Sequence, residues 1–201
     1  MSIEFKIKKV READSSQNLV MAVSELASQG DQAAIPTLIE VLGYNNPGAA
    51  VAAVNGLVKL GRVSVEPILN QIDGYNYGAR AWAVRALAEI GDGRALELLL
   101  DSAANDFSAS VRRSATKGLG NLTWKDFSAQ QLCDIKQVII DSLLKASQEP
   151  EWVVRYAAIS SLEAIASIDQ PKIIQYLQTR KSIETDMTVG ARIQMALEKL
   201  L

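Results

Sequence analysis

Positively charged side chains recur at repeat intervals in this chain, and their chemistry suits an acidic ligand. Arg80, Arg112 and Arg155 follow one another at spacings of 32 and 43 residues, and Ala50 holds the corresponding earlier position. The planar guanidinium fork can bind a carboxylate such as a propionate through two hydrogen bonds. The alternative is structural, because an arginine at the start of a helix often bonds a neighbouring turn.

Two further repeat positions vary in size and polarity and are expected to face solvent or a ligand. They hold Val51, Ala81, Arg113 and Tyr156 in one case, and Asn55, Arg85, Lys117 and Ser160 in the other. Second helices of such repeats form concave surfaces that bind partners. We predict that the charged and aromatic members line a binding surface, the alternative being an ordinary solvated helix face. These members are Arg85, Arg113, Lys117 and Tyr156.

Aromatic residues accompany these positions. Trp82 stands where the other repeats have alanine or serine, so it either fills a local gap or projects into a groove. An aromatic turn recurs after 31 residues, first at Tyr44 and then as Tyr75, Asn76 and Tyr77. Turn chemistry explains the asparagines but not the tyrosines, so these loops are candidates for ligand contact.

The residue inventory excludes several kinds of catalytic site. The chain has no histidine, which removes a Ser-His-Asp triad, a Cys-His pair and the usual zinc sites, so no metal is expected. The single cysteine, Cys133, allows no internal disulfide and is expected to be a small buried apolar residue. No catalytic residue can be assigned from the sequence.

Charge and hydropathy narrow the choice of partners. The chain has 201 residues, of which 48% are apolar, and its 21 basic and 23 acidic residues give a net charge of −2. Nucleic-acid binding normally requires a basic surface, so no nucleic acid is expected as a partner. No uncharged apolar run is long enough to span a bilayer, and no signal peptide opens the chain. These features suit a cytoplasmic protein with no membrane partner.

Self-similarity predicts the architecture. Segments beginning near residues 48, 78, 110 and 153 share small and leucine positions at a helical period, and no segment alternates like a strand. Partner helices are expected at 32–42, 65–72, 94–101 and 171–177, with a longer helix from about 130 to 146 after an insertion at 123–129. We predict an all-α solenoid, or superhelix, of about five HEAT-like helix pairs in one domain spanning residues 1–201. Residues 1–29 and 186–201 are the expected caps, and the second matches the repeat loosely through Val189, Gly190, Ala191 and Arg192.

Local signals support these helix boundaries. Asp31, Asp92 and Asp169 stand where a carboxylate can accept hydrogen bonds from free helical N–H groups. Helix ends are expected at four glycines that can adopt a left-handed conformation. These glycines are Gly30, Gly43, Gly61 and Gly91. Trp124 and Trp152 flank the long helix and are expected to anchor it.

Four segments in this order resemble the E/F-type phycobilin lyases. They are residues 44–54, 76–92, 106–115 and 151–156. The resemblance covers nearly the whole chain, and the length and layout are most similar to the smaller F subunit of the lyases that act on the phycocyanin α-subunit. A related F subunit that also isomerises the bilin has an adjacent His-Cys pair in its signature, which this sequence lacks.

The resemblance implies a lyase subunit that works as a heterodimer with an E-type subunit in the cytoplasm of a cyanobacterium. The pair would attach phycocyanobilin, its substrate, to a cysteine of the phycocyanin α-subunit through a thioether, without isomerisation and without a permanently bound cofactor. The residues singled out above would bind the bilin or the partner. One alternative is a non-catalytic HEAT-repeat scaffold or chaperone for phycobiliprotein subunits. Another is an interaction solenoid unrelated to bilins.

Overall fold

The computed structural model describes residues 2–72 and 76–201, and within these ranges every regular element is a helix, as expected. The contacts group the chain into two compact units, Met1–Ala95 (unit 1) and Leu96–Leu201 (unit 2). The expectation that both belong to a single domain stays a prediction.

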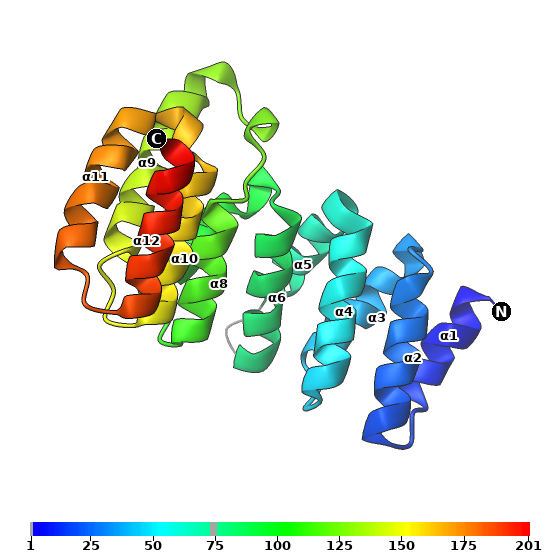
Figure 1. The fold of residues 1–201 in the computed structure, drawn as a ribbon. Helices are drawn as coiled ribbons and strands as arrows, with labels where there is room; N and C mark the ends of the chain where they lie inside the picture. The colour runs from blue at the N-terminus through cyan, green and yellow to red at the C-terminus, as the bar shows by residue number, and fades with distance from the viewer. Residues whose placement is uncertain (1, 73–75) are drawn as a thin grey trace. The chain divides into compact units, whose positions relative to one another are not determined.

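Unit 1 consists of three helix pairs (Figure 1). The second helices α2, α4 and α6 pack side by side, and each contacts the first helix of its own pair. The pairs are α1 (Ile3–Arg11) with α2 (Ser16–Ser28), α3 (Ile35–Leu42) with α4 (Pro47–Leu60), and α5 (Val65–Gln71) with α6 (Tyr77–Ile90). Short 3-10 turns stand before α3, before α5 and after α6, at Gln32–Ala34, Gly61–Ser64 and Gly93–Ala95.

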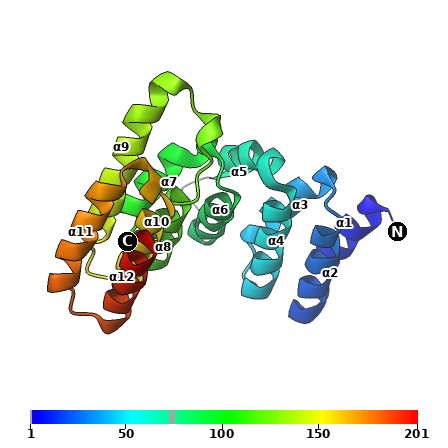
Figure 2. The same cartoon turned by 45° about the horizontal axis from the view of Figure 1, so that its top comes forward.

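Unit 2 repeats this arrangement. Its second helices α8, α10 and α12 form one layer, with α10 packed between the other two, and α7, α9 and α11 lie behind them (Figure 2). The pairs are α7 (Leu96–Asn105) with α8 (Ala109–Leu119), α9 (Ala129–Ala146) with α10 (Trp152–Ala164), and α11 (Gln170–Ile183) with α12 (Met187–Leu200). Further 3-10 turns occur at Trp124–Asp126 and Ala166–Ile168.

The described residues therefore contain six helix pairs, one more than the approximate number expected. The additional pair is α1 with α2, which occupies the region 1–29 that was expected to be a cap. At the other end, the region 186–201 contains the single helix α12.

The repeat positions interpreted as core are buried. The small position, occupied by Ala53, Ala83, Ala115 and Ala158, and the leucine position, occupied by Leu57, Leu87, Leu119 and Leu162, are at most 3% exposed throughout. Small side chains let neighbouring second helices approach closely, while the leucines fill the space between the two layers. Burying one such leucine contributes about 2 kcal/mol.

Helix boundaries follow the predicted capping residues. Asp31, Asp92 and Asp169 each accept a hydrogen bond from a backbone N–H at the start of the following helical turn, at 2.9, 3.0 and 3.2 Å. Asn46, which precedes α4, accepts one from the N–H of Ala49 at 3.0 Å. These bonds satisfy N–H groups that a helix start leaves unpaired.

Three of the four predicted glycine stops have positive φ, namely Gly30, Gly61 and Gly91. Gly43 ends α3 as predicted, but the expectation of a left-handed conformation was wrong, because its φ is −85°. A Cβ at this position would lie 2.8 Å from Asn76 Nδ2. Glycine at position 43 thus leaves room for the Asn76 side chain and does not serve a left-handed turn.

The stretch Pro47–Gln71 is long and apolar enough to cross a membrane by length and composition alone. It is not one continuous α-helix, because Gly61, at φ +71°, separates α4 from α5. Its apolar side chains Val54, Leu57 and Ile68 are fully buried within unit 1. Packing within the unit therefore accounts for these apolar residues of the stretch.

Two predictions about the long helix α9 were wrong, namely that Cys133 is buried and that Trp152 anchors the helix. Cys133 is exposed rather than buried. The fully packed side chains of α9, among them Ile139, Ile140 and Leu143, all lie in its C-terminal half. The apolar period continues into the N-terminal half, where the neighbouring helices no longer cover it. Trp152 is 45% exposed and therefore does not serve as a buried anchor.

Candidate functional site

The arginine of the first helix pair in unit 2, Arg112 on α8, joins three segments. Arg112 donates from Nε and Nη2 to the two carboxylate oxygens of Glu149, at 2.8 and 3.1 Å. Its Nη1 donates to the backbone carbonyls of Asp106 and Phe107, both at 3.0 Å. The guanidinium fork thus fixes the turn before α8 and joins it to the loop before α10.

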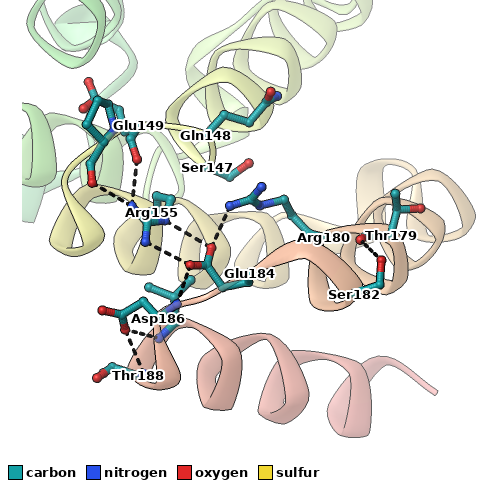
Figure 3. A network of polar contacts seen from close by, with 12 residues as sticks. Ser147, Gln148, Glu149, Arg155, Thr179, Arg180, Ser182, Glu184, Asp186 and Thr188 are labelled. Carbon is teal, nitrogen blue, oxygen red and sulfur yellow. Dashed lines mark hydrogen bonds and ion pairs between the residues drawn. The ribbon is translucent and has the colours of Figure 1, made fainter.

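Arg155 repeats this pattern one helix pair later (Figure 3). It donates from Nε and Nη2 to Glu184 at 3.1 and 2.9 Å, and from Nη1 to the carbonyls of Glu149 and Pro150, both at 2.8 Å. Arg180 adds a second cation to Glu184 at 2.6 Å. Both arginines therefore have the structural role considered from the sequence. For Arg112, ligand binding stays a prediction.

Glu184 is the most strongly perturbed acid of this network. Burial by itself raises the pKa of a carboxyl group, but hydrogen bonds from Arg155, from the Asp186 backbone N–H and from Arg180 outweigh it and hold the pKa of Glu184 at about 2. The carboxylate is therefore ionised throughout the neutral range. Its side chain is 1% exposed, so Glu184 is a buried structural carboxylate that joins Arg155 and Arg180 rather than a proton donor.

The final repeat has a different register from the one read in the sequence. Val189 is fully buried and occupies the place of Val111 and Val154, which puts Gly190 at the arginine position. Arg192, which resembled that arginine in the sequence, instead donates to Ser160 Oγ at 2.9 Å and pairs with Glu163. The contact made by Arg112 and Arg155 is therefore not repeated on α12.

This register brings nine positions together on the exposed face of α8, α10 and α12. We call it the unit 2 face. On each helix the positions are four residues apart, so the three side chains point the same way. They are Ala109, Arg113 and Lys117 on α8, Trp152, Tyr156 and Ser160 on α10, and Met187, Ala191 and Met195 on α12. Of the predicted site residues, Arg113, Lys117 and Tyr156 meet here.

The predicted site residues of unit 1 lie in other surroundings. Tyr75 is outside the described residues. Asn76 accepts a hydrogen bond from the N–H of Ala79 at 3.0 Å and so caps α6, while Tyr77 is the first residue of that helix and half-buried. Asn76 and Arg80 line a cavity of about 190 Å³. This volume lies below the range of roughly 300–1,000 Å³ typical of sites for small organic ligands.

Tyr44 is half-buried and donates a hydrogen bond to the Glu40 carboxylate at 2.7 Å. Burial, followed by this hydrogen bond, raises the pKa of Tyr44. The hydroxyl is thus held by its own helix pair and stays protonated at neutral pH.

Trp82 and Arg85 interact with each other on α6. The Arg85 guanidinium lies 5.6 Å from the centre of the Trp82 ring, and its Nε donates to Glu89 at 3.0 Å. The half-buried tryptophan is therefore covered by a cation that is itself paired.

A larger cavity contains none of the predicted site residues. It measures about 490 Å³ and lies in unit 2 against α7 and α9, where Ala103, Leu144, Lys145 and Gln148 contribute to its wall. The small residues near the end of α7 gave no sequence signal for it, because alanines in a helix period are read as core.

Comparison with known proteins agrees with this architecture. Residues 79–105 match a family model described as "PBS lyase HEAT-like repeat", and residues 139–168 match one described as "HEAT repeat". The helix pairs and these matches define a HEAT-repeat protein of the α-solenoid class.

Relatives of the same length make the family specific. The chain is 47% identical to the "Phycocyanin alpha phycocyanobilin lyase CpcF" of Synechocystis sp. (strain ATCC 27184 / PCC 6803 / Kazusa), with 98% of this chain and 94% of that protein covered. It is 48% identical to a "Phycocyanobilin lyase subunit beta" of Nostoc sp. (strain PCC 7120 / SAG 25.82 / UTEX 2576), with 92% and 93% covered. The chain belongs to the CpcF-type family of phycobilin lyase subunits.

A solved structure supports the same assignment. The chain resembles one described as the complex of CpcE and CpcF of phycocyanin lyase from Nostoc sp. PCC7120, with a TM-score of 0.77 and 48% identity. The similarity covers 83% of this chain and 99% of the chain in that structure.

Proposed function

We propose that this chain is the smaller subunit of a heterodimeric phycobilin lyase. With an E-type partner it attaches phycocyanobilin to a cysteine of the phycocyanin α-subunit through a thioether. The observation that carries the proposal is 47% identity over essentially the whole chain to a protein named as a phycocyanin α phycocyanobilin lyase. The likeness to a chain solved together with CpcE supports the heterodimer.

The residue inventory suits this reaction. The nucleophile is the thiol of the acceptor, so the lyase does not have to supply one. The sulfur adds across a double bond of the bilin, a carbon–sulfur bond forms, and the proton of the thiol is balanced by a proton delivered to the bilin carbon. No group leaves. The task of this chain is to hold the bilin and the acceptor in a productive arrangement, which can lower the barrier substantially.

The residues proposed to contact the bilin or the partner are those predicted from the sequence. They fall into two sets, one on each unit. Unit 1 contributes Tyr44, Tyr75, Asn76, Tyr77, Arg80, Trp82 and Arg85, and unit 2 contributes Arg112, Arg113, Lys117 and Tyr156. Arg113 and Lys117 have the best support, since both are exposed on one face of α8.

The attachment is proposed to proceed without isomerisation of the bilin, because the chain has no histidine and so no His-Cys pair. No permanently bound cofactor takes part, and the bilin is a substrate. The proposed setting is the cytoplasm of a cyanobacterium.

Co-expression tests the proposal. This chain, an E-type subunit, the phycocyanin α-subunit and a source of phycocyanobilin are combined, and covalent bilin is measured on the acceptor after denaturation. Parallel cultures omit this chain. We expect covalent product with the absorbance of unisomerised phycocyanobilin only when both subunits are present. Equal attachment without this chain would refute a lyase role and favour a scaffold or chaperone.

A further inference from the structure

The unit 2 face exposes more large apolar surface than a folded unit needs. Trp152 is 45% exposed, Tyr156 38%, Met187 89% and Met195 59%. Fully buried, such side chains would each remove about 150–250 Å² from water. Together they expose roughly 400–600 Å², which is the size of the largest apolar patch on a typical monomer, and such a patch is often functional.

Hydrogen bonds of Arg155 and Glu184 fix the helix ends that carry this face. Arg155 holds the carbonyls of Glu149 and Pro150, immediately before the helix that begins with Trp152. Glu184, which Arg155 also binds, accepts a hydrogen bond from the N–H of Asp186 at 3.0 Å, immediately before Met187. Arg155 and Glu184 thus fix the N-terminal ends of α10 and α12, where Trp152 and Met187 lie.

The composition of the face indicates a protein rather than a small molecule. Ligand sites are concave, and the 490 Å³ cavity of this unit lies elsewhere, against α7 and α9. Tryptophan, tyrosine, methionine and arginine are the residues enriched in the centre of protein interfaces. The unit 2 face has all four.

Charge limits the choice of occupant. The nine positions of the face carry two cations, Arg113 and Lys117, and no acid, although the whole chain has a net charge of −2. A second copy using the same face in a symmetric contact would offer these cations no carboxylate, because the face carries none. A complementary surface must instead combine apolar side chains with carboxylates opposite α8.

We propose that the unit 2 face is the surface on which the E-type lyase subunit docks, which rests on the proposed function. A permanent interface is more apolar than one that must release its partner. The acceptor α-subunit has to leave after each turnover, whereas the relative in the solved complex was captured with its E-type partner. The exposed tryptophan and methionines therefore suit the E-type subunit better than the acceptor.

The test compares the affinity of this chain for the E-type subunit by titration calorimetry. The variant Trp152→Glu/Met187→Glu changes residues at the first positions of α10 and α12, where a glutamate is favoured by the helix dipole, so the chain should still fold. The control is Val138→Glu, which alters an apolar residue of similar exposure (48%) on α9, away from this face.

We expect the test variant to bind the E-type subunit at least about 30-fold more weakly, as truncation of central interface residues does. The control should remain within about twofold of the unchanged chain. Equal affinity for the test variant would overturn the proposal, and so would a self-association of this chain that the test variant abolishes.

The attachment assay separates the two proposals. If the variant keeps its affinity but loses bilin attachment, the face contacts the bilin or the acceptor, and docking of the E-type subunit is wrong. If the unchanged pair binds through this face but attaches no bilin to the α-subunit, the proposed function fails and the docking surface stands.

Discussion

The buried carboxylate of Glu184 gives the sharpest test of how the repeats are joined. We consider Glu184→Gln, which keeps the shape of the side chain but removes its charge. Arg155 and Arg180 would then keep their places, 12% and 14% exposed, without a counterion. Removing one partner of a buried pair costs about 3–5 kcal/mol. The amide retains part of the hydrogen bonding, so we expect a loss of about 3 kcal/mol at pH 7.

The same carboxylate makes stability depend on pH. Its pKa is about 2 in the folded chain, below the ordinary value of 4.5. A lowered folded pKa stabilises the protein fully above the unfolded pKa, and this contribution is lost as the pH falls from about 4.5 towards 2. After allowance for solvent screening, the contribution is about 2 kcal/mol. The glutamine variant should lack this part of the acid dependence.

Urea unfolding followed by circular dichroism at pH 7 and pH 3 measures both effects. With a slope of about 2–3 kcal/mol per molar urea, the midpoint of Glu184→Gln should fall by about 1–1.5 M at pH 7. The control is Glu12→Gln, which alters an exposed pair with Lys8 and should change stability by less than about 0.5 kcal/mol. Identical midpoints for the unchanged chain and Glu184→Gln at pH 7 would refute the claim that the ion pairs of Glu184 stabilise unit 2.

Four further substitutions test the surroundings of single residues. Gly120→Ala should destabilise unit 2 by about 3 kcal/mol or more, because the added Cβ would lie 2.5 Å from the Cβ of Ser161. The added Cβ of Gly190→Ala meets nothing within 4 Å, so this variant should stabilise α12 by about 0.5–1 kcal/mol. Comparing the melting temperatures of the two variants with that of the unchanged chain tests both expectations. Asn46→Ala should cost about 1–2 kcal/mol through the lost cap, and an unchanged melting temperature would contradict that role. Cys133→Ser should leave stability and bilin attachment unchanged in the co-expression assay, whereas lost attachment would place this exposed thiol in the reaction.

The helix pairs and their core positions could be predicted because they depend on local periodicity. Alanine and leucine columns identify the buried faces of second helices, and aspartates identify helix starts, without knowledge of any long-range contact. The capping hydrogen bonds of Asp31, Asp92 and Asp169 confirm that part of the prediction.

The partners of the arginines could not be predicted in the same way. Glu149 is 37 residues from Arg112, and Glu184 is 29 residues from Arg155, so the pairs form only when one helix pair stacks on the next. In the sequence, each glutamate is one acid among 23. Only the stacked structure distinguishes it.

The exposed methionines were missed because the register of the last repeat was misread. Arg192 resembles the repeated arginine in the sequence, but the buried Val189 places Gly190 at that position. Only this corrected register aligns Met187 and Met195 with Trp152 and Ser160. Cys133 was misjudged for a related reason, since an apolar period does not show where the covering helices end.

The central claim, that this chain is a catalytic subunit, is tested most directly by the stoichiometry of the purified reaction. Phycocyanin α-subunit and phycocyanobilin are supplied in excess, the E-type subunit is fixed at a low concentration, and this chain is titrated. A lyase subunit predicts that covalent product exceeds the amount of this chain many times, with a rate that saturates at one chain per E-type subunit. A rate independent of this chain, or product that never exceeds its amount, would contradict the account.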